Sequence, residues 1–144
     1  MNSSIIDMIV VHGSFTKPSM DIGFAEIDKW HKDRGFSMCG YHWIILRNGV
    51  LETGRPEHQQ GAHAKLVNRH SIGVCLIGGM DEFGNSDCNY TFDQYDTLYK
   101  LLHDIKLRHP TVERVVSHRD VDKKGKTCPD FDAEAFVNWE TGNV

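Results

Sequence analysis

Residues 5–11, IIDMIVV, decide the fold of this chain, and a His-Gly-Ser tripeptide at 12–14 follows them directly. The stretch is mostly apolar and rich in β-branched side chains, which is typical of a strand buried in the middle of a sheet. Residues 71–77, SIGVCLI, have the same character and end at a pair of glycines. The sequence therefore predicts two buried strands, around which the other elements are arranged.

Three segments outside these strands predict helices. Residues 21–34 are amphipathic, with apolar side chains at helical spacing. Residues 91–108 begin with Thr91 followed by Gln94, the pattern of a capping box, and continue with apolar residues on one face. Residues 130–139 predict a last helix. Helices in these positions separate the strands along the chain.

Residues 42–52 predict a β-hairpin, because Asn48-Gly49 stands between two apolar runs and accepts the positive φ angles of a type I′ turn. Residues 114–117 predict a further short strand that ends at a histidine. Strands interleaved with helices, together with one hairpin, indicate an α/β fold: a mixed central β-sheet with about three packed α-helices.

Composition excludes several classes of protein. The 144 residues carry 16 Lys and Arg against 20 Asp and Glu, a formal net charge of −4, which does not suggest a nucleic-acid or membrane binder. No apolar stretch reaches the roughly 18 residues of a membrane span. The four cysteines form no CxxC pair, and Asp7 interrupts an apolar run that no basic region precedes. We therefore expect a single domain, 1–144, with reduced thiols and no secretory signal peptide.

Two histidines stand where predicted strands end, His12 after the first strand and His118 after the strand at 114–117. Strand ends are where α/β sheets gather ligands and catalytic groups. Cys128 follows His118 by ten residues, in a loop that could fold back over it. Two imidazoles and a thiolate suit a catalytic zinc ion, whose fourth position stays open. The residues alone leave another interpretation, in which the histidines bond to backbone and the cysteine is a small buried side chain.

Six segments, in order along nearly the whole chain, closely resemble the zinc-dependent N-acetylmuramoyl-L-alanine amidases of the type 2 amidase and peptidoglycan-recognition superfamily. The resemblance is strongest to the small single-domain amidases of short-tailed bacteriophages. The segments are VVHGS (10–14), KWHKDRGF (29–36), CGYHWIILRNG (39–49), GAHAKLVNRHSIGVCLIGG (61–79), VVSHRD (115–120) and KTCPDFD (126–132). The resemblance implies an amidase/peptidoglycan-recognition-like fold.

The resemblance also implies a function and a metal. The family's zinc ligands correspond to His12, His118 and Cys128, with one Zn²⁺ per chain. The implied reaction is hydrolysis of the amide between N-acetylmuramic acid and the L-alanine of the stem peptide. Zinc suits that reaction because an amide carbonyl is a poor electrophile and water is a poor nucleophile at neutral pH. The chain is thus expected to be a bacteriolytic, endolysin-like peptidoglycan hydrolase.

Three further residues receive roles from the resemblance. The family's catalytic tyrosine corresponds to Tyr41, and its catalytic lysine, two residues before the ligand cysteine, corresponds to Lys126. The lysine would stabilise the oxyanion of the tetrahedral intermediate. The motif histidine that lines the substrate cleft corresponds to His63, which implies a substrate-binding role.

The implied partner is bacterial peptidoglycan, with no nucleic acid and no membrane, and the chain is expected to be a monomer. Some small phage amidases also bind their own phage's RNA polymerase and restrain transcription, so a second role of this kind is a further expectation. The protein is expected to be made in the host cytoplasm and to act on the cell wall after release by a holin or by lysis.

Two other functions are compatible with the residues. One is a non-catalytic peptidoglycan-binding module, which the presence of Cys128 disfavours because superfamily members that only bind commonly lack that ligand. The other is a metal-independent cysteine hydrolase, with Cys128 as nucleophile, His118 as base, and Asp120 or Asp130 as the carboxylate that orients the base. A strong chelator distinguishes these chemistries, because only a zinc enzyme loses activity in it.

Overall fold

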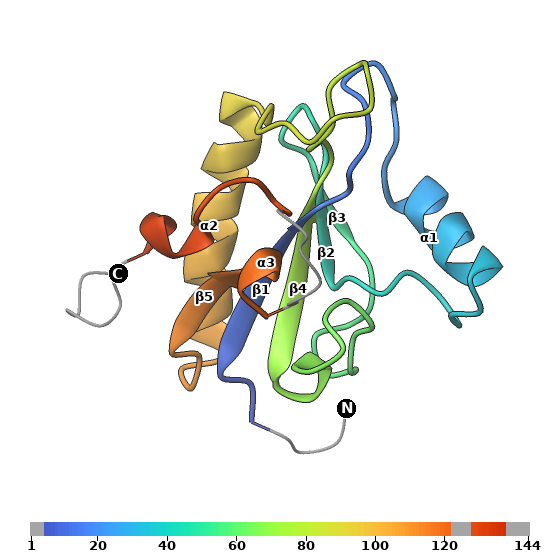
Figure 1. Cartoon of the computed structure of the whole chain (residues 1–144). Coiled ribbons are helices and arrows are strands. Elements are labelled where there is room, and N and C mark those ends of the chain that lie inside the picture. Colours follow the sequence, from blue (N-terminus) through green and yellow to red (C-terminus); the bar gives the residue numbers. More distant parts are fainter. Residues whose placement is uncertain (1–4, 122–127, 138–144) are drawn as a thin grey trace.

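One mixed sheet of five strands, in the order β3-β2-β4-β1-β5, forms the centre of the molecule (Figure 1). A computed structural model describes residues 5–121 and 128–137. Strand β1 is parallel to both β4 and β5, β2 is parallel to β4, and β3 is antiparallel to β2. The strands are β1 (Met8–Gly13), β2 (Trp43–Ile45), β3 (Leu51–Thr53), β4 (Ser71–Leu76) and β5 (Arg114–Ser117).

The two strands predicted from apolar runs are confirmed as the central ones. All six residues of β4 are buried, and so are the inner four of β1. A strand with neighbours on both edges and elements on both faces has no exposed side, so it needs a continuous apolar run and not an alternating one. Strand β1 starts at Met8, later than the apolar run, and extends through His12 to Gly13.

The two long helices cover opposite faces of the sheet (Figure 1). Helix α2 (Phe92–Arg108) packs through Leu98, Leu102 and its other buried apolar residues on the face that contains Val11. Helix α1 (Phe24–Asp33) places Ile27 in a separate cluster on the other face. Each buried leucine or isoleucine side chain stabilises the fold by about 1.5–3 kcal/mol. Within the described ranges, no helix has the length and apolar character needed to cross a membrane.

The hairpin β2–β3 forms as predicted, but its turn is not the type I′ turn expected from Asn48-Gly49. The carbonyl of Leu46 accepts a hydrogen bond from Gly49 N–H at 2.8 Å, and Leu46 N–H donates to Val50 at 2.9 Å. Gly49 has φ +85°, whereas Asn48 does not have a positive φ. A type I′ turn needs positive φ at both positions, so the chain uses a three-residue loop with its glycine in the left-handed region.

The third helix is not where the sequence predicted it. Residues 130–137 contain only a short 3₁₀ helix, η2 (Ala133–Phe136), and residues 138 and 139 lie outside the described part of the chain. Ala133 N–H donates to Ser117 Oγ at 2.9 Å, which ties this segment to the end of β5. Val137 is extended, so the helix cannot continue through it. The third helix is instead α3 (His118–Val121), directly after β5.

Candidate metal centre

His12 is the fifth residue of β1 and is 1% exposed. Side chains alternate between the two faces of a strand, so Val11 points to the helix α2 side and His12 points to the opposite face. In the parallel pairing of β1 and β5, Val11 is opposite Ser117. The next residue of β1 is His12, and the first residue after β5 is His118; the ring centroids of the two histidines are 4.3 Å apart.

Cys128 completes a group of three candidate ligands. Its Sγ accepts a hydrogen bond from Gly13 N–H at 3.0 Å and lies 3.5 Å from the Gly13 carbonyl oxygen. One ligand atom from each of His12, His118 and Cys128 lies within 4.8 Å of the others. The structure therefore brings together the three residues that strand ends and the family resemblance single out. Two nitrogens and one sulfur at this spacing fit a zinc ion and leave a coordination position for substrate or water.

His63 contacts the candidate ligand His12, but it is not among the residues that line the cavity next to the three candidate ligands. Its Nδ1 lies 2.8 Å from His12 Nε2, and its Nε2 lies 3.3 Å from Ser71 Oγ. A Cβ on Gly73 would lie 2.5 Å from the His63 ring, so only glycine admits the ring there. Burial lowers the pKa of His63 well below its usual value, and nearby histidines add to this, so the ring is neutral at pH 7. This geometry favours an orienting contact with His12 over the predicted place in the substrate cleft.

Tyr41 lies on the other side of His12, with the two ring centroids 5.0 Å apart. The backbone fixes it on both sides: Gly40 N–H donates to His31 Nδ1 at 2.8 Å, and the Tyr41 carbonyl accepts from Arg55 N–H at 2.9 Å. Burial raises the pKa of Tyr41 well above its usual value, and the charges of nearby cysteines raise it further. The predicted catalytic tyrosine is therefore beside the candidate ligands.

A cavity of about 410 Å³ opens in front of the three candidate ligands, and Tyr41 is part of its wall. Phe15 and Asp130 also line it, and both have positive φ, at 57° and 74°. Residues other than glycine seldom adopt this left-handed conformation, which costs on the order of 1–3 kcal/mol and recurs at functional sites. The bends at these two residues shape the rim of the cavity.

Two site residues need separate comment. Lys126, the predicted catalytic lysine, lies outside the described residues. Tyr90 was not predicted: it lines the cavity, and its buried hydroxyl oxygen has no hydrogen-bond partner in the described part of the chain. No motif marks Tyr90 in the sequence, because it follows a polar loop and reaches the cavity only through the tertiary fold.

The fold and the site define a class: an α/β domain with a histidine–histidine–cysteine centre at the ends of parallel strands. A sequence profile described as "N-acetylmuramoyl-L-alanine amidase" matches residues 2–131. The chain belongs to this family of amidases. The predicted family, fold class and enzyme class are thereby confirmed.

Similar proteins agree with this assignment. The chain is 43% identical to the endolysin of Escherichia phage T7 over 138 residues, which cover 96% of this chain and 88% of that protein. It is 42% identical to the endolysin of Enterobacteria phage K11, over 93% of this chain and 85% of that protein. Among solved structures, the amidase LysC from Clostridium intestinale has a TM-score of 0.73 at 29% identity, over 88% of this chain and 77% of that chain. Bumblebee PGRP-SA shares the fold, with a TM-score of 0.74 at 21% identity, over 93% of this chain and 81% of that chain.

Proposed function

We propose that this amidase is a zinc-dependent endolysin, with one Zn²⁺ held by His12, His118 and Cys128. The observation that carries the proposal is the convergence of the three ligand atoms within 4.8 Å of one another, at the wall of the cavity. Its substrate is the amide between N-acetylmuramic acid and L-alanine in bacterial peptidoglycan. The amidase family match supports this substrate, and the phage endolysins that match nearly the whole chain support an action on the cell wall.

When bound, zinc would polarise the amide carbonyl and lower the pKa of water. The protein's own groups prepare the ligands for this chemistry. The contact between His63 and His12 at 2.8 Å holds the His12 ring in one orientation. The hydrogen bond from Gly13 N–H to Cys128 Sγ at 3.0 Å holds the sulfur at the end of strand β1.

Tyr41 and Lys126 would act on the substrate. The Tyr41 hydroxyl would orient the attacking water in the cavity, and this role rests on its position beside His12. The Lys126 ammonium would stabilise the oxyanion that develops on the carbonyl oxygen. The role of Lys126 rests on the resemblance alone, since this residue is outside the described ranges.

The expected setting of the enzyme belongs to the same proposal. We expect a monomer with a single domain, 1–144, made in the host cytoplasm and active on the cell wall after release by a holin or by lysis. The phage origin of its relatives supports this setting. A second role in restraining a phage RNA polymerase stays a prediction from the resemblance. A pull-down with the polymerase of the same phage would test it.

One experiment tests the reaction and the metal together. Purified protein digests cell wall before and after treatment with a strong chelator, and then after addition of Zn²⁺. We expect new L-alanine amino termini, loss of activity in the chelator and its return with zinc. Activity that survives the chelator would favour the cysteine hydrolase, a new reducing sugar end would indicate a glycosidase, and no release at all would indicate a binding module.

A further inference from the structure

The hydroxyl of Tyr90 is the most unusual polar group near the site. Tyr90 is 8% exposed, and its oxygen is buried with no hydrogen-bond partner among the described residues. A buried hydroxyl without a partner destabilises the folded state, and a phenylalanine would avoid that cost. We therefore expect the Tyr90 hydroxyl to gain a hydrogen-bond partner in another state of the protein.

The position of this hydroxyl is set by Gly13. A Cβ built on Gly13 would lie 2.0 Å from Tyr90 Oη, and one built on Gly79 would lie 2.7 Å from it. No side chain fits at such a distance, so the hydroxyl occupies the space that a residue other than glycine would fill at position 13. Gly13 is also the residue whose N–H donates to Cys128 Sγ at 3.0 Å. Tyr90 Oη and the Cys128 sulfur therefore both pack against Gly13, and both residues line the same cavity.

Metal binding changes the hydrogen bonds that the sulfur of Cys128 can make. As a thiol, Cys128 can donate its proton to the Gly13 carbonyl oxygen, 3.5 Å away. A metal ligand is a thiolate, which cannot donate and accepts hydrogen bonds instead. Tyr90 can supply such a bond, because a phenol carries its proton at neutral pH and this hydroxyl has no hydrogen-bond partner among the described residues.

We propose that Tyr90 is a positioning residue for the metal centre: its hydroxyl donates a hydrogen bond to the Cys128 thiolate in the metal-bound protein, and Gly13 leaves the space for it. This inference rests on the proposed zinc site. Hydrogen bonds of this kind orient a metal ligand and tune its charge, and their loss typically weakens metal affinity by about 10–100-fold.

The test measures zinc affinity by competition with a chromophoric chelator. We expect Tyr90→Phe to bind Zn²⁺ about 10–100-fold more weakly than the parent. The metal-free Tyr90→Phe protein should melt no lower than the metal-free parent, because the lost hydroxyl has no partner there. Tyr95→Phe is the matched control: its hydroxyl contacts Cys88 Sγ at 3.3 Å, outside the centre, and the variant should keep the parent affinity.

Two outcomes would overturn the inference in different ways. If Tyr90→Phe keeps the parent affinity while the parent binds zinc, the inference alone is wrong. If the parent binds no zinc, the proposed metal centre fails, and the inference fails with it.

A second pair of variants tests the packing on Gly13 by thermal unfolding of the metal-free protein. Gly13→Ala should lower the melting temperature of the parent and lower that of Tyr90→Phe by less, since the closest atom is then missing. Equal losses in the two backgrounds would contradict the placement of the hydroxyl.

Discussion

The four cysteines of this chain differ in what their environments allow them to do. Burial raises the pKa of Cys39 to about 11 and raises the pKa of Cys75 well above its usual value, so neither becomes a thiolate easily. Cys88 is exposed. Cys128 alone is grouped with two histidines in the described ranges. Cys128 is therefore the candidate metal ligand because of its position beside the two histidines.

We expect Cys128→Ser to lose tightly bound zinc and nearly all activity, because a serine hydroxyl is not readily deprotonated and gives the metal no thiolate charge. Cys88→Ser should keep zinc at about one per chain. Elemental analysis of the dialysed proteins measures both. Stoichiometric zinc in Cys128→Ser would show that the sulfur is not a ligand.

Substitutions of Lys126 test the catalytic step separately from metal binding. Lys126→Ala should keep its zinc and lose a factor of about 10²–10³ in kcat, the usual effect of removing one oxyanion donor. Lys126→Arg should recover part of that loss, since a planar guanidinium places its donors differently from an ammonium. Rates of cell-wall digestion on zinc-loaded protein give the values. Lys123→Ala and Lys124→Ala are the controls, and an equal loss in them would indicate a general effect of surface charge.

Tyr41→Phe tests the second catalytic role. The variant keeps the ring that packs beside His12 and removes only the hydroxyl, so zinc content and melting temperature should stay near those of the parent. The kcat should fall while KM changes little, because the hydroxyl acts on groups that develop charge in the transition state. A parent-like kcat would remove Tyr41 from the reaction.

At the residue scale, strand ends and the family resemblance together predict the three candidate ligands, but they do not predict the residues that contact these ligands. His12 and His118 follow apolar runs, and strands in register bring such residues to one edge of a sheet. The contact of His63 with His12 and the placement of Tyr90 against Gly13 depend on how loops return to the sheet. Hydrophobic periodicity does not predict how these loops pack against the sheet.

Elements are predicted well where one signal dominates. Helix α2 begins at the predicted capping box, with Thr91 Oγ1 accepting from Gln94 N–H at 3.1 Å and Gln94 Oε1 accepting from Thr91 N–H at 2.9 Å. The hairpin turn and the last helix were predicted wrongly, because tertiary contacts compete there with local preference. In the turn, Thr91 Oγ1 and Thr97 Oγ1 donate to the carbonyls of Arg47 and Gly49 at 2.6 and 2.7 Å. The bond from Ala133 N–H to Ser117 Oγ is one such tertiary contact.

Gln94 links this helix to the sheet, which gives a prediction at the scale of the element. Its amide is fully buried and donates to the carbonyls of Ile45 and Ile77 at 3.1 and 2.8 Å. Gln94→Leu would leave both carbonyls without these donors, and we expect the free energy of unfolding to fall by about 2–4 kcal/mol. Thr91→Ala removes the cap and the hydrogen bond that Thr91 Oγ1 donates to the Arg47 carbonyl at 2.6 Å, and it should cost less, about 1–2 kcal/mol. Urea denaturation compares the two, and equal losses would contradict the linking role.

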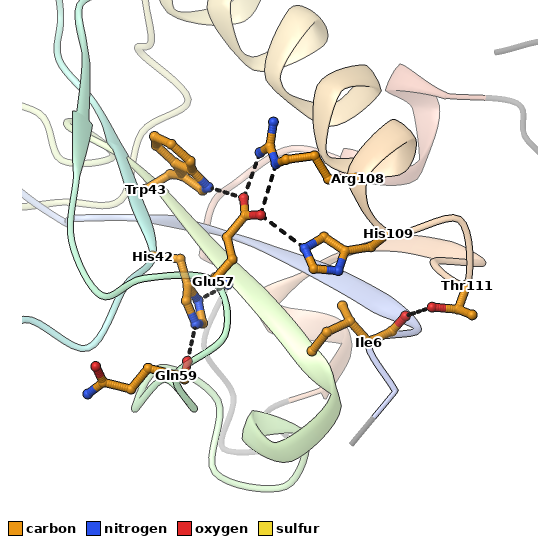
Figure 2. A network of polar contacts seen from close by, with 9 residues as sticks. Ile6, His42, Trp43, Glu57, Gln59, Arg108, His109 and Thr111 are labelled. Carbon is orange, nitrogen blue, oxygen red and sulfur yellow. Dashed lines mark hydrogen bonds and ion pairs between the residues drawn. The ribbon is translucent and has the colours of Figure 1, made fainter. Parts of the chain in front are cut away.

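At the scale of the whole molecule, Glu57 is the residue that connects the end of helix α2 to strand β2 (Figure 2). Its carboxylate accepts hydrogen bonds from Arg108 at 2.6 and 3.0 Å and from Trp43 Nε1 at 2.6 Å, and it lies 3.0 Å from His109 Nε2. Burial on its own would raise the pKa of Glu57, but these bonds more than offset burial and lower the pKa from 4.5 to about 2. The carboxylate therefore stabilises the folded state in its charged form.

This shift predicts how stability depends on pH. A depressed pKa contributes stability that is complete above the unfolded value of 4.5 and is lost as the pH falls towards 2. We expect that contribution to be on the order of 3 kcal/mol in full. Urea unfolding of metal-free Glu57→Gln should show a lower free energy at pH 7 and a weaker loss between pH 4.5 and 2 than the parent. If Glu57→Gln and the parent lose the same free energy of unfolding between pH 4.5 and 2, this role of Glu57 is contradicted.

The central strand β1 comes early in the chain, whereas its neighbour β5 and the sulfur of Cys128 come late, and the hydrogen bond from Gly13 to Cys128 spans 115 positions. During translation, at roughly 5–20 residues per second, the first ligand exists on the order of ten seconds before the third is made. A nascent chain can fold parts of its sheet in that time, but it cannot assemble the proposed zinc centre. The chain would then become active only after Cys128 has been synthesised. A polypeptide that ends before Cys128 would not hydrolyse the cell wall.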